Sequence, residues 1–311
     1  MLIRFQNLSI VDDRYRKKLL KSINNFFDHG LMILGPEVLD FEKKIAKFCK
    51  TKYAIGVSSG TDALYLALHS LGIGKGDEVI TSPLSWVSST NAIAMVGAKP
   101  VFVDIKEDLN IDETKIENKI TNKTKAIMPI HFTGNMCEMN KIRKIAKNYN
   151  LKIIEDAAQA FGSTYRGSPS GSMGDIGCFS LNPMKILNAF GEAGIIVTNN
   201  AKLAKKINIL RYAGTVNKEN CYYPSLNFKI DAIQAAILNI NLTLVNEKIR
   251  KRQKLAKRYE RNLKNIVKCP NVNKENYNSY YSYTILVEKR EKLIKFLKKN
   301  KIETKIQHPI L

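Results

Sequence analysis

Residues 53–83, YAIGVSSGTDALYLALHSLGIGKGDEVITSP, decide the fold class. The stretch begins with a short, nearly continuous apolar run, YAIGV, and passes through two serines and a glycine into a helical pattern, TDALYLALHSLGI. A second apolar run, DEVITSP, follows after a short glycine-rich turn. Apolar runs without alternating polar residues are typical of strands that are buried on both faces, and helices between them are typical of a parallel sheet.

The same alternation continues to about residue 199. Further apolar runs occur at KPVFVDI, KAIMPIHF, LKIIEDAA, DIGCFSL and AGIIVTN, with helical patterns between several of them. We therefore expect an α/β domain whose mixed, mostly parallel sheet is sandwiched between helices.

The pattern changes after about residue 231. A long helical stretch covers 231–264, and a polar linker then leads to YSYTILVE at 281–288, which predicts a strand, and EKLIKFLKKNK at 291–301, which predicts a helix. We divide the chain into a large domain, 1–240, whose N-terminal segment is a candidate to pack on the small domain, and residues 241–311. The second part holds the long helix and the start of a small α+β domain, which we expect to be truncated.

Composition narrows the class of protein. The 311 residues are 44% hydrophobic, which suffices for a sizeable core. No apolar run reaches the roughly 20 residues needed to span a bilayer, and the N-terminus lacks the apolar block of a signal peptide. The five cysteines are scattered and form no C-x-x-C pair, which argues against a disulfide framework or a zinc site. We expect a cytoplasmic protein with no membrane segment and no metal.

The formal net charge of +22 raises the question of a nucleic-acid partner. Most lysines lie on amphipathic stretches such as EKIRKRQKLAKRYERNLK, 247–264, where a solvated helix face accounts for them. We therefore expect no nucleic-acid partner. A positive field would also attract an anionic substrate, such as a phosphorylated or nucleotide-linked one.

Three stretches contain residue types that carry chemistry, and the first is SSGTDAL, 58–64. Gly60 permits a tight turn at a strand end, and Thr61 or Ser59 would cap the helix that follows. Free backbone N–H groups and the helix dipole at such a point favour a phosphate. Taken alone, a plain N-cap with a glycine turn is the commoner explanation.

The second stretch, IIEDAAQAFGS at 153–163, ends a buried strand with two acids. Glu155 and Asp156 point in opposite directions, so one of them is expected to face the crevice at the strand's carboxyl end. A carboxylate there needs a cation, either the protonated ring nitrogen of a cofactor or a neighbouring Arg or Lys. Gln159 is near enough in sequence to reach the same site. Taken alone, structural pairing is the commoner explanation.

The third stretch, CFSLNPMKILNAFGEAG at 178–194, places Lys185 in a loop after a strand. Burial and positive neighbours lower the pKa of a lysine, and the neutral amine forms a Schiff base with an aldehyde. Ser180, at the strand end, would hold a phosphate beside it. A surface lysine in a loop is the commoner explanation of this stretch alone.

Together the three stretches predict a site for pyridoxal phosphate (PLP). A phosphate-binding turn, a strand-end acid and a loop lysine are the parts that PLP needs, because the acid keeps the pyridinium protonated and the ring then acts as an electron sink. Trp86, the only tryptophan, follows another strand end. It is either a core residue or a stacking partner of the ring.

Seven blocks of the chain, in order, resemble the DegT/DnrJ/EryC1/StrS family of PLP-dependent sugar aminotransferases, which have the aspartate-aminotransferase fold (fold type I). The blocks are SSGTDALYLAL, DEVITSPLSWVSSTNAI, VGAKPVFVDI, ITNKTKAIMPIHFTGNMCEM, IIEDAAQAFGS, GDIGCFSLNPMK and GEAGIIVTN. The resemblance implies transfer of an amino group from an amino acid, glutamate, to a nucleotide-linked keto-sugar. Such reactions serve the biosynthesis of polysaccharides, other glycans and the sugars of secondary metabolites.

The resemblance also implies a role for each matching residue. Lys185 would bind PLP covalently and act as general acid and base, and Asp156 would pair with the pyridinium nitrogen. Family members are homodimers with shared active sites, which implies a contribution from Asn227 of the partner subunit at the phosphate. The other implied cofactor contacts are Gln159 at the ring oxygen, Trp86 on the ring face, and Gly60, Thr61 and Ser180 at the phosphate. The candidates for the substrate site are Lys229 and His308.

The chain departs from the family pattern at four positions. Asn182, Ile186, Ala193 and Lys229 stand where histidine, asparagine, glycine and arginine are frequent. These changes affect the pocket for the substrate rather than the chemistry of the loop lysine. Two alternatives stay open. One is a protein of this fold that binds a sugar nucleotide or nucleic acid without catalysis. The other is a PLP-dependent sugar dehydratase, since some relatives that have histidine in place of the lysine dehydrate the sugar.

Overall fold

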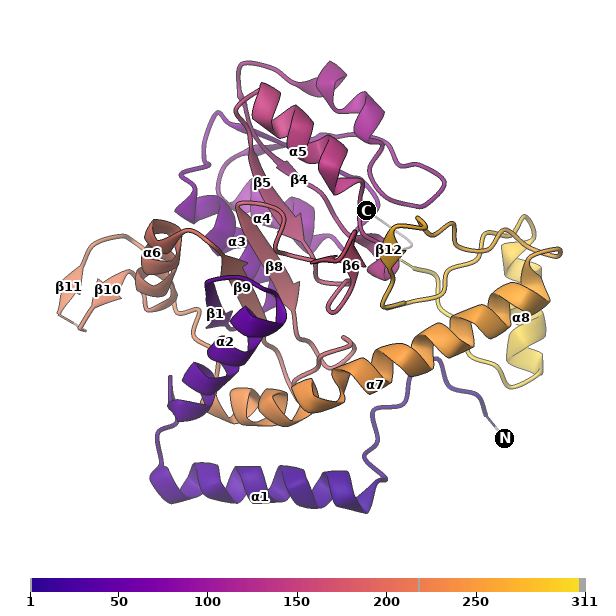
Figure 1. The fold of residues 1–311 in the computed structure, drawn as a ribbon, viewed down its shortest axis with the longest axis horizontal. Coiled ribbons are helices and arrows are strands. Elements are labelled where there is room, and N and C mark those ends of the chain that lie inside the picture. The colour runs from indigo at the N-terminus through magenta and orange to yellow at the C-terminus, as the bar shows by residue number, and fades with distance from the viewer. Residues whose placement is uncertain (1, 218, 308–311) are drawn as a thin grey trace.

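The computed structural model describes residues 2–217 and 219–307, and its centre is a seven-stranded sheet (Figure 1). β9 is antiparallel to both of its neighbours, and every other neighbouring pair is parallel. The expected mixed, mostly parallel sheet is thus confirmed. In order across the sheet, the strands are β1 (Tyr53–Val57), β9 (Gly194–Thr198), β8 (Ile176–Ser180), β5 (Lys152–Asp156), β4 (Thr124–Met128), β2 (Glu78–Thr81) and β3 (Lys99–Phe102).

A layer of helices covers each face of the sheet. Alternation along β9 shows the division, because Ile196 belongs to the core on one face while Ile195 and Val197 belong to the core on the other. Six of the seven strands are therefore largely buried on both sides, as their continuous apolar sequences predict, whereas the edge strand β3 is partly exposed. The first layer consists of α3 (Gly60–Ser70), α4 (Ser88–Met95) and α6 (Ala201–Arg211), and the second of α2 (Pro36–Phe48), α5 (Met139–Asn148) and α7 (Ala232–Leu263).

The N-terminal helix α1 (Asp13–His29) lies outside this sandwich, along α7 (Figure 1). It begins after Asp12, whose side chain accepts a hydrogen bond from the backbone N–H of Tyr15, and it ends at Gly30 with φ 64°. The segment before α1 contacts the C-terminal part of the chain, where Ile3 forms a parallel bridge with Ile302. The two ends of the described chain are therefore in contact.

Shorter elements complete the chain. A hairpin of β10 (Thr215–Val216) and β11 (Asn220–Cys221) follows α6, and β6 (Thr164–Tyr165) pairs with both β7 (Ser168–Pro169) and β12 (Asn276–Tyr277). Three single-turn helices are η1 (Glu113–Lys115), η2 (Glu117–Lys119) and η3 (Phe132–Gly134).

The C-terminal region differs in part from expectation. The helix predicted at 291–301 is present as α8 (Arg290–Lys299), beside the far end of α7 (Figure 1). The strand predicted at 281–288 is wrong: only Leu286 forms a bridge, with Lys268, and no strand of the described chain pairs with the rest of that run. An apolar run needs a neighbouring strand for its backbone groups before it becomes one. α7 crosses residue 240 without a break, so the division into two domains there stays a prediction.

Residues 2–217 and 219–307 contain no helix that is both long and apolar enough to cross a membrane. The same ranges contain no group of three or more His, Cys, Asp or Glu side chains that could hold a metal ion.

Candidate active site

The three stretches that predict a cofactor site meet at the carboxyl edge of the sheet. The turn before α3 follows β1, Asp156 ends β5, and Ser180 ends the neighbouring strand β8. The turn touches β8 directly, because a Cβ atom added to Gly60 would lie 2.5 Å from the Cβ of Ser180. Ligands of α/β proteins commonly bind at this edge, outside the carboxyl ends of the strands.

The start of α3 is built to receive an anion. Ser59 caps the helix, with its Oγ accepting from the backbone N–H of Asp62 at 3.1 Å, and Ser58 Oγ donates to the Asp62 carboxylate at 2.7 Å. The cap is thus Ser59 rather than Thr61, whose Oγ1 donates to Ser88 Oγ at 2.9 Å. The first turn of a helix leaves backbone N–H groups without intrahelical acceptors, and these fit a phosphate.

Of the two acids that end β5, Glu155 is structural. Its carboxylate is fully buried and accepts hydrogen bonds from the backbone N–H groups of Gly171, Met173 and Gly174, at 2.6–2.9 Å. His131 Nε2 lies 2.9 Å from Glu155 Oε2. The protein itself therefore satisfies this carboxylate.

Asp156 has different surroundings. Its carboxylate is also buried, and it accepts one hydrogen bond at each oxygen, from the Ala158 N–H at 3.1 Å and from Ser89 Oγ at 2.7 Å. None of the ion pairs in the described part of the chain includes it. A buried carboxylate without a cation is costly, and each oxygen retains a second acceptor site. Asp156 therefore fits a protonated ring nitrogen.

Lys185 lies half-buried in the loop between β8 and β9. Burial lowers the pKa of its amine from 10.5 to about 8, and the negative charges of Asp156 and Glu192 oppose part of that shift. Its Nζ lies 4.7 Å from the centre of the Tyr281 ring. A lysine with such a pKa is partly neutral at moderately alkaline pH, which makes it both a nucleophile and a proton acceptor.

The loop that carries this lysine is fixed from two sides. On the α7 side, the backbone oxygen of Asn188 accepts from Asn241 Nδ2 at 2.6 Å, and its Oδ1 accepts from Lys248 Nζ at 2.9 Å. Across the mouth of the loop, Asn182 Nδ2 donates to Glu192 Oε1 at 2.5 Å. These contacts attach the loop to α7 and join its two ends.

Two further cofactor candidates lie near the carboxyl edge. Gln159 is buried, and its Oε1 accepts from the backbone N–H of Thr133 at 2.9 Å. Trp86 is 60% exposed, so this residue is not a core tryptophan. Its place, just before α4, leaves the ring-stacking role as a prediction.

The remaining candidates, for the partner's contribution and for the substrate, come from the C-terminal half of the chain. Asn227 is exposed on a segment that runs beside the end of β1, where the carbonyl of Phe228 accepts from the Ser58 N–H. Lys229 pairs with Val57 through its backbone, and its Nζ lies 4.3 Å from the centre of the Tyr212 ring. His308, the other substrate candidate, lies outside the described residues.

Sequence reasoning missed three residues of this region. Ser85 and Ser89 connect to Asp156 through hydrogen bonds, and Tyr281 faces the amine of Lys185. The serines resemble ordinary polar residues at a helix start, and Tyr281 is distant in sequence from the lysine. Burial of two closely spaced serines is visible only in the fold.

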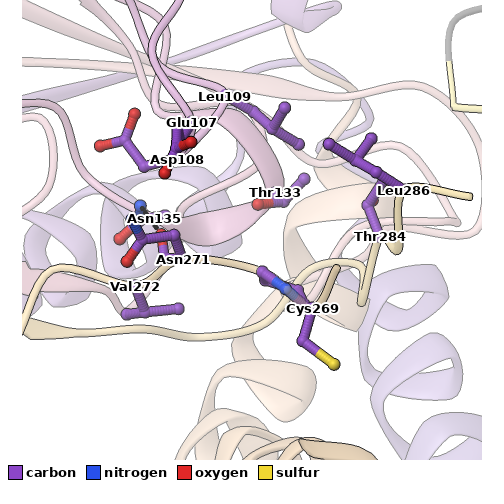
Figure 2. Close-up of a pocket in the computed structure, with 11 residues that line it drawn as sticks. Glu107, Asp108, Leu109, Thr133, Asn135, Cys269, Asn271, Val272, Thr284 and Leu286 are labelled. Carbon is purple, nitrogen blue, oxygen red and sulfur yellow. Dashed lines mark hydrogen bonds between the residues drawn. The ribbon is translucent and has the colours of Figure 1, made fainter. Parts of the chain in front are cut away.

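A separate small pocket lies between the loop 107–109, the segment 133–135 and the C-terminal segment 269–286 (Figure 2). None of the residues predicted to bind the cofactor lines it. Thr133 connects it to the site through its hydrogen bond to Gln159. Burial also raises the pKa of Asp108 in its wall. The predicted cofactor site lies elsewhere, at the carboxyl edge of the sheet.

The fold, with a half-buried loop lysine near a buried strand-end aspartate, is that of a PLP-dependent aminotransferase. More specifically, the chain belongs to the DegT/DnrJ/EryC1/StrS aminotransferase family, whose model matches residues 13–311. The family resemblance seen in the sequence is confirmed. Aminotransferases of this family depend on PLP, which is therefore the cofactor.

Three similar proteins illustrate the family. The dTDP-3-amino-3,6-dideoxy-α-D-galactopyranose transaminase of Aneurinibacillus thermoaerophilus is 41% identical over 99% of this chain and 86% of its own. The UDP-2-acetamido-2-deoxy-3-oxo-D-glucuronate aminotransferase of Pseudomonas aeruginosa is 36% identical over 99% of this chain and 87% of its own. The crystal structure of DesV from S. venezuelae with a ketimine intermediate has a TM-score of 0.97 and 34% identity, covering 99% of this chain and 84% of that one. These relatives favour an aminotransferase over the two alternatives.

Proposed function

We propose that this enzyme transfers the amino group of glutamate to the keto group of a nucleotide-linked sugar. The proposal rests on two residues of one site. Burial lowers the pKa of Lys185 to about 8, and the buried Asp156 has no ion-pair partner in the described part of the chain. The two relatives above are named for dTDP-linked and UDP-linked sugars. A net charge of +22 favours an anionic substrate of that kind.

The residues at the carboxyl edge fit PLP, and each has a proposed place. Asp156 faces the ring nitrogen, as its free acceptor sites allow. When bound, PLP supplies an aldehyde for Lys185 and an electron sink for the reacting carbon. The remaining contacts are Gln159 at the ring oxygen, Trp86 on the ring face, and Gly60, Thr61 and Ser180 at the phosphate.

Lys185 moves the protons of the reaction. In the first half, its neutral Nζ takes a proton from the α-carbon of glutamate. In the second half, Nζ delivers a proton to the sugar carbon that receives the amino group. A pKa of about 8 suits both directions near neutral pH, since general acid–base catalysis works best when the pKa of the group lies near the working pH.

The proposal includes a cytoplasmic homodimer with shared active sites. Asn227 of the partner subunit would reach the phosphate, and in support of this Asn227 is exposed on a segment beside β1. The cysteines of the chain are free thiols, three of them buried, which suits a reducing compartment. Lys229 and His308 are proposed for the substrate's charged groups. The division into domains 1–240 and 241–311 belongs to the same proposal.

The test is a product assay on the full chain. Purified protein, PLP and glutamate are incubated with a panel of dTDP-, UDP- and GDP-linked keto-sugars, and the products are identified by mass spectrometry. We expect an amino-sugar from at least one substrate and none from Lys185→Ala. The proposal fails if no panel member is aminated and borohydride does not fix PLP onto Lys185.

A further inference from the structure

The first turn of α4 contacts two parts of the site at once. Ser88 Oγ accepts a hydrogen bond from Thr61, in the phosphate-binding turn, and the next residue, Ser89, donates to Asp156 Oδ2 at 2.7 Å. Behind Ser89 lies Ser85, with the two Oγ atoms 2.8 Å apart. Ser85, Ser89 and Asp156 are each less than 5% exposed.

The direction of these hydrogen bonds follows from their chemistry. An ionised carboxylate only accepts, so the single hydroxyl proton of Ser89 must point to Asp156. Ser89 then accepts from Ser85, whose hydroxyl is the donor. The three residues form a one-way chain, Ser85 to Ser89 to Asp156, which ends on the carboxylate oxygen.

This series of hydrogen bonds determines which way the Asp156 carboxylate faces. The Ala158 N–H holds Oδ1 at 3.1 Å and Ser89 holds Oδ2, so rotation of the carboxylate about its χ2 bond is blocked by two donors on different oxygens. A hydroxyl that is itself an acceptor is polarised into a stronger donor, and hydrogen bonds to a charged group are stronger than neutral ones. The remaining acceptor sites of the carboxylate then point in a fixed direction.

We propose that Ser89, supported by Ser85, is a positioning residue that fixes the Asp156 carboxylate toward the ring nitrogen of the cofactor. This inference rests on the proposed function, because it takes the ring nitrogen as the missing cation of Asp156. It goes beyond that function because two buried hydroxyls, those of Ser85 and Ser89, would orient the carboxylate that keeps the ring protonated and therefore an effective electron sink.

The test compares Ser89→Ala with two matched variants. Ser89→Thr keeps the hydroxyl, and Ser70→Ala removes another buried serine hydroxyl, one that donates within α3 to the Ala67 carbonyl at 2.9 Å. The measurements are the pH midpoint of the absorbance of bound PLP, the dissociation constant of PLP, the rate of the half-reaction with glutamate, and the melting temperature.

Ser89→Ala is expected to slow the half-reaction by about 10- to 100-fold, the range for losing one hydrogen bond to a charged group. The pH midpoint of the absorbance should rise. When the ring nitrogen is less often protonated, it repels a second proton less, so the nitrogen that links the cofactor to Lys185 is easier to protonate. Ser85→Ala should move the same quantities in the same direction by less, and it serves as the test if Ser89→Ala does not fold. Ser89→Thr should restore wild-type values.

Two results would overturn the inference. One is a Ser89→Ala enzyme whose pH midpoint and rate match those of Ser70→Ala, since its effect would then be only on stability. The other is a Ser89→Thr enzyme that folds but shows the defects of Ser89→Ala. Failure of the proposed function itself looks different, because the wild-type protein would then bind no PLP and show no half-reaction.

Discussion

At the scale of single residues, two adjacent carboxylates that are almost equally buried differ in their hydrogen-bond donors. Glu155 accepts hydrogen bonds from three backbone N–H groups and lies within hydrogen-bond distance of the His131 imidazole, whereas Asp156 accepts from one backbone N–H and one hydroxyl. The sequence shows only that one of them faces the crevice. Which one does so depends on the loop 171–174, whose backbone folds around Glu155 and leaves Asp156 for a ligand.

Exchanging each acid for its amide should separate the two roles. Asp156→Asn removes the charge that would keep the cofactor ring protonated, and the half-reaction with glutamate should slow by about 10²–10⁴-fold, as for a lost contact of roughly 3–5 kcal/mol. PLP should still bind. Glu155→Gln places an NH₂ group among N–H donors, so the melting temperature should fall while the rate of the folded enzyme stays near wild type. Stopped-flow rates and melting curves check both, and an Asp156→Asn enzyme that reacts at full speed would contradict the assignment.

The lowered pKa of Lys185 predicts how the cofactor-free protein captures PLP. Only the neutral amine attacks the aldehyde, so below pH 8 the rate should rise by about tenfold per pH unit and then level off above it. Stopped-flow absorbance between pH 6 and 10 measures the profile. Lys248 has a pKa lowered to about 8 as well, chiefly by burial. Lys248→Gln is therefore the control: it removes this second amine, keeps a donor for Asn188 Oδ1, and should keep the midpoint. A midpoint near 10 would show that burial does not activate Lys185.

At the scale of elements, apolar runs predicted the seven strands of the sheet because all of them except the edge strand β3 are largely buried on both faces. The same reasoning failed for YSYTILVE, where a similar run has only Leu286 paired. Two-residue strands such as β6 and β7 lie below the length at which any periodicity can be recognised. For the site, motif order located Lys185 and Asp156. The hydrogen bonds from Ser85 through Ser89 to Asp156 depend on how the start of α4 meets the end of β5, which no local pattern records.

The contact between the start of α3 and the end of β8 gives a prediction about Gly60. A Cβ there would lie 2.5 Å from the Cβ and 2.9 Å from the Cα of Ser180. Gly60→Ala should therefore push the two elements apart, weaken PLP binding by about tenfold or more and lower the melting temperature, although alanine favours helices. Gly74→Ala, whose Cβ would meet only Val96 O at 3.4 Å, is the matched control. Equal PLP dissociation constants for the two variants would show that close packing at this point is not needed for the phosphate site.

At the scale of the whole molecule, a shared active site can be tested by mixing two inactive variants. Lys185→Ala removes the amine, and Asn227→Asp places a negative charge where a phosphate is expected. If each site takes Lys185 from one subunit and Asn227 from the other, a mixed dimer contains one site with neither change. Co-expression should then restore about a quarter of wild-type activity, because half of randomly formed dimers are mixed. No recovery despite mixed dimers, detected by two affinity tags, would contradict a shared site.

The reversed direction of β9 has a consequence for how the molecule folds. Because β9 returns beside β8, the lysine loop closes a hairpin between neighbouring segments, whereas every parallel pair in the sheet joins strands across a longer crossover. Closing a short loop costs less chain entropy than closing a long one, and local contacts form faster. The β8–β9 hairpin is therefore expected to assemble before the parallel pairs. In pulse-labelling hydrogen exchange, the amides of the hairpin should gain protection before those of β2 and β4. The segment that contains the reactive amine would then fold before the parallel part of the sheet.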